Sequence, residues 1–156
     1  MIRAATEADV PAVVQLVEEL AAYERAPAGT VRLTPDLLRE AVFGAAPTAY
    51  VHVAEEGGEV VGFALWFVSF STWVGRPGVY LEDLFVRPER RGAGHGKALL
   101  QSLARVAVDR GYGRVEWAVL DWNTPAIAFY RSLGAVAMDE WTVHRLDEAA
   151  LRELAG

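Results

Sequence analysis

A glycine-spaced basic loop in the middle of the chain has the chemistry of a pyrophosphate-binding site. The loop covers residues 91–97 (RGAGHGK), follows an apolar strand-like segment, and opens directly into a segment with helical periodicity. Its glycines let backbone N–H groups approach an anion with no Cβ in the way. The start of the helix adds unpaired N–H groups and a positive dipole, while Arg90, Arg91 and Lys97 add full charges.

Two common phosphate-binding motifs do not fit this loop. A Walker loop needs four residues between Gly and Gly-Lys, but Gly92 and Gly96 enclose three. A dinucleotide fingerprint that starts at Gly92 needs its third Gly where Lys97 stands. The pattern that fits is Arg-x-x-Gly-x-Gly, starting at Arg91 and placed after a strand. A plain Gly-rich turn with solvated arginines is the alternative.

The segments around the loop predict an α/β fold with a mixed sheet. Strands are expected at residues 2–4, 50–56, 60–70, 79–86 and 114–120, with two more in 135–146. Helices are expected after Thr6, after Thr34, after the loop, from Thr124 to Gly134 and at 147–154. Residues 72–78 are expected to form a loop. Because no repeat or linker interrupts the chain, one domain over residues 1–156 is expected.

Composition excludes several classes of function. The chain has no cysteine, so disulfides, thiolate metal sites and a Cys nucleophile are excluded, and three widely spaced histidines argue against a metal site. Residues 1–60 hold 10 acidic and 4 basic side chains, and residues 61–156 hold 11 of each, which disfavours nucleic-acid binding. No apolar stretch reaches membrane-spanning length, and the N-terminus lacks an apolar signal region. No membrane partner and a cytoplasmic location are expected.

The loop pattern resembles the acetyl-CoA loop of the GNAT superfamily of N-acetyltransferases. Residues 20–24 (LAAYE), 80–86 (YLEDLFV) and 122–130 (WNTPAIAFY) are similar to segments of the diamine (spermidine/spermine-type) acetyltransferases. This resemblance extends over essentially the whole chain. It implies a GNAT fold, with a mostly antiparallel mixed sheet of about seven strands splayed at the acetyl-CoA site and flanked by helices. It also implies acetyl-CoA as co-substrate, no metal and a homodimer.

The resemblance assigns catalytic roles to Tyr130 and Glu82. Tyr130 matches the family's catalytic tyrosine, and a phenol that is protonated at neutral pH can donate a proton to a departing thiolate. A half-buried core tyrosine is the alternative. Glu82 matches the substrate glutamate and is expected to accept the amine proton, directly or through water; the alternative is a solvated edge-strand glutamate. Period-two alternation places Glu82 with Tyr80 on one face and Asp83 with Leu81 on the other, so the adjacent carboxylates are not expected to act side by side.

Further contacts follow from the same resemblance. The implied acetyl-CoA contacts are the strand end, the loop and a helix start: Leu84, Phe85, Val86, Arg91, Gly92, Ala93, Gly94, His95, Gly96, Lys97, Asn123, Thr124, Pro125 and Ala126. The implied substrate contacts are Tyr23, Glu24, Glu82, Glu116, Trp117 and Ala118. Asn123 could equally be a plain helix-start residue, and His95 is expected on the loop exterior without a catalytic role. The segment between Tyr130 and Trp141 is shorter than expected for a eukaryotic polyamine enzyme. Those enzymes place an acidic substrate contact in this segment, and here either Asp139 or Glu140 could supply it.

The implied function is transfer of an acetyl group from acetyl-CoA to a primary amine of a small polyamine or diamine. Direct attack in a ternary complex is expected because no thiol can carry the acetyl group. Two alternatives stay open: acetylation of a thialysine-like or lysine-like amino acid or another amine, and a non-catalytic acyl-CoA-binding module. A hydrolase is not expected, since no Gly-x-Ser-x-Gly elbow is present.

Overall fold

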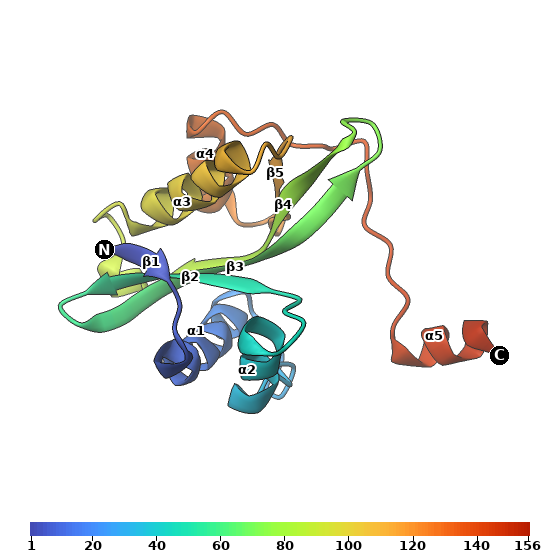
Figure 1. Cartoon of the computed structure of the whole chain (residues 1–156), viewed down its shortest axis with the longest axis horizontal. Helices are drawn as coiled ribbons and strands as arrows, with labels where there is room; N and C mark the ends of the chain where they lie inside the picture. The colour runs from blue at the N-terminus through green and yellow to red at the C-terminus, as the bar shows by residue number, and fades with distance from the viewer. The chain divides into compact units, whose positions relative to one another are not determined.

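A five-stranded mixed sheet organises the first part of the chain (Figure 1). The computed structural model describes residues 1–156, which form two compact units, Met1–Ala118 and Val119–Gly156. In sheet order the strands are β1 (Ile2–Ala4), β2 (Tyr50–Glu56), β3 (Glu59–Ser71), β4 (Arg76–Val86) and β5 (Val115–Glu116). Strands β1 to β4 pair antiparallel, and β5 runs parallel to β4. The α/β fold with a mostly antiparallel mixed sheet is therefore confirmed.

Helices cover both faces of this sheet. The first unit contains α1 (Val10–Tyr23), α2 (Pro35–Phe43) and α3 (His95–Asp109), with short 3-10 turns at Glu7–Asp9 and Pro88–Arg90. Figure 1 shows α1 and α2 on one face and α3 on the opposite face. The second unit contains α4 (Thr124–Ser132) and α5 (Glu148–Ala155). None of the helices combines the length and apolar character that crossing a bilayer requires.

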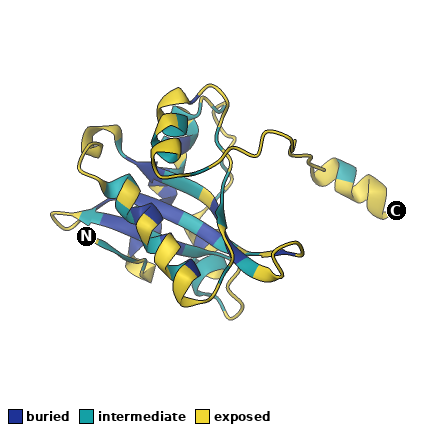
Figure 2. Ribbon diagram, turned by 90° about the horizontal axis from the view of Figure 1, so that it is seen from above, coloured by how far each residue is buried: buried dark blue, intermediate teal, exposed yellow.

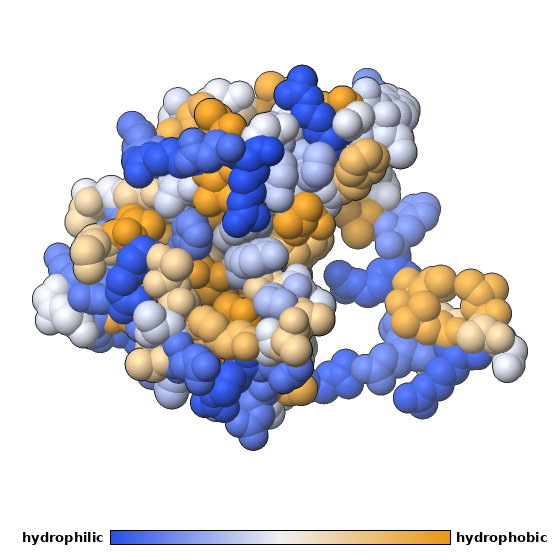
Figure 3. All heavy atoms as spheres, in the orientation of Figure 1, coloured by the Kyte–Doolittle hydropathy of each residue, from blue (hydrophilic) through white to orange (hydrophobic).

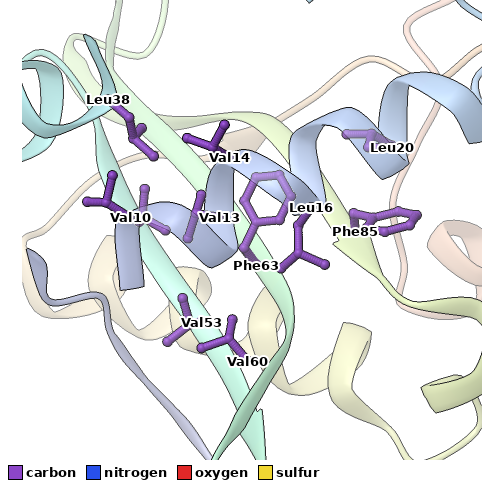
Figure 4. Close-up of a cluster of buried hydrophobic side chains, with 11 residues drawn as sticks. Val10, Val13, Val14, Leu16, Leu20, Leu38, Val53, Val60, Phe63 and Phe85 are labelled. Carbon is purple, nitrogen blue, oxygen red and sulfur yellow. The ribbon is translucent and has the colours of Figure 1, made fainter. Parts of the chain in front are cut away.

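The main core lies between α1 and the sheet. Apolar residues recur on α1 at helical spacing, and Val13 and Leu16 on this stripe belong to one buried cluster with Phe63 and Phe85 from the strands (Figure 4). Figure 2 shows the buried residues running along the strands, with exposed residues on the outer sides of the helices. This packing fixes the C-terminal end of α1, where Tyr23 and Glu24 lie, against the end of β4.

Several expected elements differ from the structure. The sheet has five strands rather than about seven, because residues 135–146 form no strand. In that segment Val136 is 80% exposed and Val143 77% exposed, so these apolar side chains are not part of a buried core. Strand β4 begins at Arg76, inside the expected loop at 72–78, because its ladder with β3 continues to the pair Ser71 and Arg76. Strand β5 covers only Val115–Glu116 of the expected 114–120. The single domain over 1–156 stays a prediction.

Candidate active site

A β-bulge lies in β4 at the position of the two adjacent carboxylates. Asp83 is opposite Leu65 of β3, and Leu81 is opposite Trp66, so Glu82 is an extra residue with no partner in the ladder. Cross-strand partners share a face and neighbours on β3 alternate, so Leu81 and Asp83 lie on opposite faces. The expected grouping of Leu81 with Asp83 is therefore wrong, and the alternation that separated Glu82 from Asp83 does not hold through the bulge.

Asp83 lies on the face of the sheet that α1 covers. Its ladder partner Leu65 packs against the core cluster beneath α1, and Phe85, two residues further along β4, belongs to that cluster. At the C-terminal end of α1, the Tyr23 ring centroid lies 6.3 Å from that of Phe85. Glu24 follows directly as the C-cap of the helix. Asp83 therefore lies near Glu24 at the end of α1, one of the expected amine contacts, and Glu82 is its neighbour in the chain.

Asp83 is the carboxylate whose acidity this arrangement changes most. Its side chain is half-buried, and burial, followed by the negative charges of Glu82 and Glu24, raises the pKa of Asp83 to about 6. Burial also raises the pKa of Glu24. Glu82 is exposed. A carboxylate with a pKa near 6 is ionised at neutral pH and is a stronger base than an ordinary aspartate. Sequence reasoning did not assign Asp83 a role.

The far edge of β4 has no neighbouring strand along its second half. Pairing with β5 ends at Tyr80, which is opposite Glu116, so β5 pairs with no residue of β4 beyond this point. The backbone groups on that edge at residues 84–86 can therefore pair with an extended group other than a strand. This is the place where the resemblance puts the pantetheine arm of acetyl-CoA.

The glycine loop after β4 presents open backbone at the start of α3. Gly94 is the N-cap residue of α3 with φ +83°, and a Cβ on Gly92 or Gly94 would meet nothing within 4 Å. No side chain caps this helix, and the first intrahelical bond runs from Ala98 N to Gly94 O at 2.9 Å. The N–H groups before Ala98 have no helical acceptor, and an anion fits such a position.

Acidic residues hold the base of this loop. Arg87 forms ion pairs with Glu19 of α1 and with Glu59 of the β2–β3 hairpin. Arg90 lies 3.6 Å from Glu56 and 3.7 Å from Glu59. The charge of Arg90 is therefore partly compensated inside the protein. Arg91 and Lys97 are both exposed cations of the loop.

Arg91 connects the loop to the residues expected to bind the amine. Its Nε donates a hydrogen bond to Val86 O at 3.0 Å, which holds the guanidinium at the end of β4. From there the guanidinium carbon lies 4.7 Å from the Tyr23 ring centroid and 5.7 Å from the Phe85 ring centroid. The expected cofactor loop and the expected substrate residue Tyr23 are therefore in direct contact, which the sequence did not indicate.

The expected position of His95 on the loop exterior is wrong. Its side chain is only 13% exposed, and its Nε2 lies 3.5 Å from Glu56 Oε2. His95 is the first residue of α3, and helical side chains point back toward the helix N-terminus. The ring is therefore turned toward the β2–β3 hairpin.

Comparison with known proteins identifies the family. The family model described as "Acetyltransferase (GNAT) family" matches residues 13–135. The chain belongs to the GNAT acetyltransferase family. It is accordingly an acetyl-CoA-dependent N-acetyltransferase that acts on amines, as the sequence resemblance implied.

Two curated proteins and one solved structure place this GNAT chain among its relatives. The thialysine N-epsilon-acetyltransferase of Bos taurus is 41% identical over 100% of this chain and 97% of its own length. The spermidine/spermine N(1)-acetyltransferase-like protein 1 of Homo sapiens is 31% identical over 99% of this chain and 23% of its own length. An integron cassette protein from the mobile metagenome of V. cholerae has a TM-score of 0.81 and 28% identity, covering 99% of this chain and 96% of that one.

Within this GNAT enzyme, Glu116 lies on β5 beside the candidate site strand. It is opposite Tyr80 of β4, and its Oε1 is 2.6 Å from the Arg114 Nε. Trp117 and Ala118 follow the end of β5. A cation of the same chain thus already pairs with Glu116, whereas Asp83 has no such partner.

Tyr130 and Asn123 belong to the second unit of the GNAT chain. Asn123 is buried and is the N-cap residue of α4, where its side chain accepts a hydrogen bond from Ala126 N at 3.4 Å, next to Pro125 in the first turn. Its role as a helix-start residue is confirmed. Tyr130 is half-buried near the end of α4, with its ring centroid 5.5 Å from that of Phe129. Asp139 and Glu140 are exposed in the irregular segment before α5.

Proposed function

We propose that this enzyme transfers the acetyl group of acetyl-CoA to the side-chain amine of a small lysine-like amino acid such as thialysine. The main support for the proposal is the half-buried carboxylate of Asp83 at the β4 bulge, close to Glu24 and followed in the chain by the glycine loop, whose helix start has no side-chain cap. The similarity to thialysine N-epsilon-acetyltransferases over the whole chain supports this acceptor over the polyamine expected first. A polyamine or diamine is the second candidate, supported by the similarity to the spermidine/spermine-type protein.

Acetyl-CoA would be held by backbone groups of the glycine loop, the edge of β4 and the start of α4. The open amides at the N-terminus of α3, with Arg91 and Lys97, suit the pyrophosphate. The edge of β4 at residues 84–86, which has no strand partner, suits the amide-rich pantetheine arm. Residues 123–126 would contribute from α4. Each of these groups is polar backbone or a cation, which is the chemistry that the cofactor needs.

The reaction would proceed by direct attack in a ternary complex. The chain has no cysteine to carry the acetyl group. The acceptor ammonium loses a proton to a carboxylate of the bulge, and the free amine attacks the thioester carbonyl carbon. The C–S bond breaks, and the departing thiolate takes a proton from the Tyr130 phenol. Parallel lines in double-reciprocal plots would indicate a ping-pong mechanism, in which one product leaves before the second substrate binds, and would contradict this scheme.

A panel of amines tests the acceptor. With thialysine, lysine, spermidine, putrescine, an aminoglycoside and an N-terminal peptide, we expect the highest kcat/KM for thialysine or lysine. The rate should rise with pH, because amines with pKa values near 10 become neutral as pH increases. Glu24→Gln should mainly raise KM for the acceptor, since it removes one carboxylate near the ammonium while the carboxylates of β4 stay. A preference for spermidine would favour the second candidate, and a preference for the peptide or the aminoglycoside would contradict both.

We also propose that the enzyme is a homodimer. Large apolar side chains are exposed on both units: Phe70 on β3 is 66% exposed and Leu154 on α5 is 74% exposed. Figure 3 shows apolar side chains gathered on α5. Such exposure is typical of surfaces that a partner covers. Light scattering at micromolar concentration should give twice the 17.0 kDa chain mass, and a value of 17.0 kDa would contradict the proposal. The cytoplasmic location stays a prediction.

A further inference from the structure

We propose that Asp83, rather than Glu82, is the carboxylate that takes the proton from the acceptor ammonium. The inference rests on the proposed acetyl transfer and names a catalytic residue for it. Glu82 then has a different role: its charge keeps Asp83 basic and helps to hold the cationic acceptor.

The geometry of the bulge is the first support. A regular strand would separate Glu82 from Asp83 on opposite faces, but the extra residue breaks that alternation. Asp83 stays in register opposite Leu65, on the face that α1 covers. It also directly precedes residues 84–86, whose open edge we assign to the cofactor arm. Asp83 is therefore positioned between the α1 residues expected to contact the amine and the strand edge proposed for the pantetheine arm.

The second support is that Asp83 has no cationic partner. No side chain donates a hydrogen bond to it and no ion pair reaches it, whereas Arg87 pairs with Glu19 and Glu59. Arg91 is held at Val86 O and over Tyr23. A structural carboxylate in a half-buried position normally has such a partner, because burial of an unpaired charge is costly. An ammonium group from the acceptor would supply the missing charge.

The surrounding charges set when Asp83 can accept a proton. The charged groups that act on Asp83 are Glu82 on its own strand and Glu24 at the end of α1, while β3 presents the apolar Leu65. Burial and the two glutamates raise the pKa of Asp83 to about 6. Asp83 is thus ionised at neutral pH but loses its ability to accept a proton as pH falls through about 6.

The proton balance requires only groups already named. The acceptor ammonium gives up two protons during its conversion to an amide. One passes to the Asp83 carboxylate and then to water, which leaves the free amine that attacks. After attack, the second proton leaves the nitrogen and restores Tyr130, which has protonated the thiolate. The products are the amide, the thiol of CoA and one released proton.

The pH dependence of kcat/KM for the acceptor separates Asp83 from Glu82. In the parent enzyme, the rise of kcat/KM with pH should be steeper below about pH 6 than above it, because both Asp83 and the amine must lose a proton there. We call this change of slope near pH 6 the break. Asp83→Asn should lower kcat by roughly 10²-fold or more and remove the break. Glu82→Gln should keep the break but move it to lower pH, since the negative charge that raises the pKa of Asp83 is gone.

Controls distinguish a chemical loss from a folding defect. Asp83→Glu should restore the break and part of the turnover, and calorimetry should show parent-like CoA affinity for all three variants. A break that persists in Asp83→Asn, or one that disappears only in Glu82→Gln, would assign the proton acceptor to Glu82 and overturn the inference. If the parent acetylates the amine panel while Asp83→Asn is fully active, only the inference fails. If the parent acetylates no amine of the panel, the proposed function fails, and the inference fails with it.

Discussion

Replacing Tyr130 by Phe is expected to lower turnover by roughly 10²–10⁴-fold while leaving CoA affinity nearly unchanged. The phenol is the proposed donor to the departing thiolate, and phenylalanine removes that proton while keeping the ring that packs beside Phe129. Helix α4 should remain intact, because its N-cap bond from Ala126 N to Asn123 is at the other end of the helix. Steady-state turnover with saturating acetyl-CoA and acceptor measures the loss, and calorimetry with CoA checks the affinity.

Tyr112→Phe is the matched control for this result. It also removes one phenolic hydroxyl, which in Tyr112 lies 3.4 Å from Arg110 Nη1 just after α3. Its turnover should stay close to that of the parent. Unchanged turnover in Tyr130→Phe would make Tyr130 a packing residue, and an equal loss in both variants would indicate a general effect of hydroxyl removal.

Gly94→Asp is expected to weaken CoA binding by roughly 10²-fold, about 2.7 kcal/mol, through charge repulsion and loss of backbone access. Gly94 has φ +83° at the N-terminus of α3, a conformation that Asp tolerates better than most residues. A carboxylate at this position is also favourable for the helix dipole. The fold should therefore survive, and a Cβ at Gly94 meets no neighbouring atom. Calorimetric titration with CoA measures the affinity, and thermal melting checks the fold.

Gly94→Asn separates charge from bulk in this experiment. Asn has nearly the same size and the same tolerance of positive φ, but it carries no charge. We expect it to weaken CoA binding less than Asp does. If Gly94→Asp binds CoA as tightly as the parent, the glycine loop is not the pyrophosphate site. If Asn and Asp weaken binding equally, backbone access rather than charge determines the affinity.

Local patterns were sufficient to predict the β2–β3 hairpin and the starts of two helices. Residues 57 and 58 are both glycines, and both adopt positive φ in the turn between β2 and β3, as a two-residue hairpin requires. The N-cap residues Thr34 and Asn123 likewise begin helices at the expected places. These features depend on neighbouring residues alone, so one sequence suffices to find them.

The bulge at Glu82 and the contact between Arg91 and Tyr23 depend on distant segments. No Gly or Pro marks residues 81–83, and the extra residue becomes visible only through pairing with Leu65 and Trp66 of β3. Tyr23 precedes Arg91 by 68 positions in the sequence, and the two residues meet because α1 packs across the end of β4. Such contacts follow from the tertiary packing, which period-two and helical spacing do not encode.

Substitutions in β4 fall into two groups because of the bulge. Leu81 and Phe85 are 2% and 3% exposed, so close packing restricts what can replace them. Glu82 has no ladder partner and an exposed side chain, so another residue can take its place without breaking a backbone pair or opening a cavity. A mutation there can change how strongly an acceptor is held at little cost in folding free energy. The extra residue therefore gives natural variation a place to alter amine preference while the strand keeps its fold.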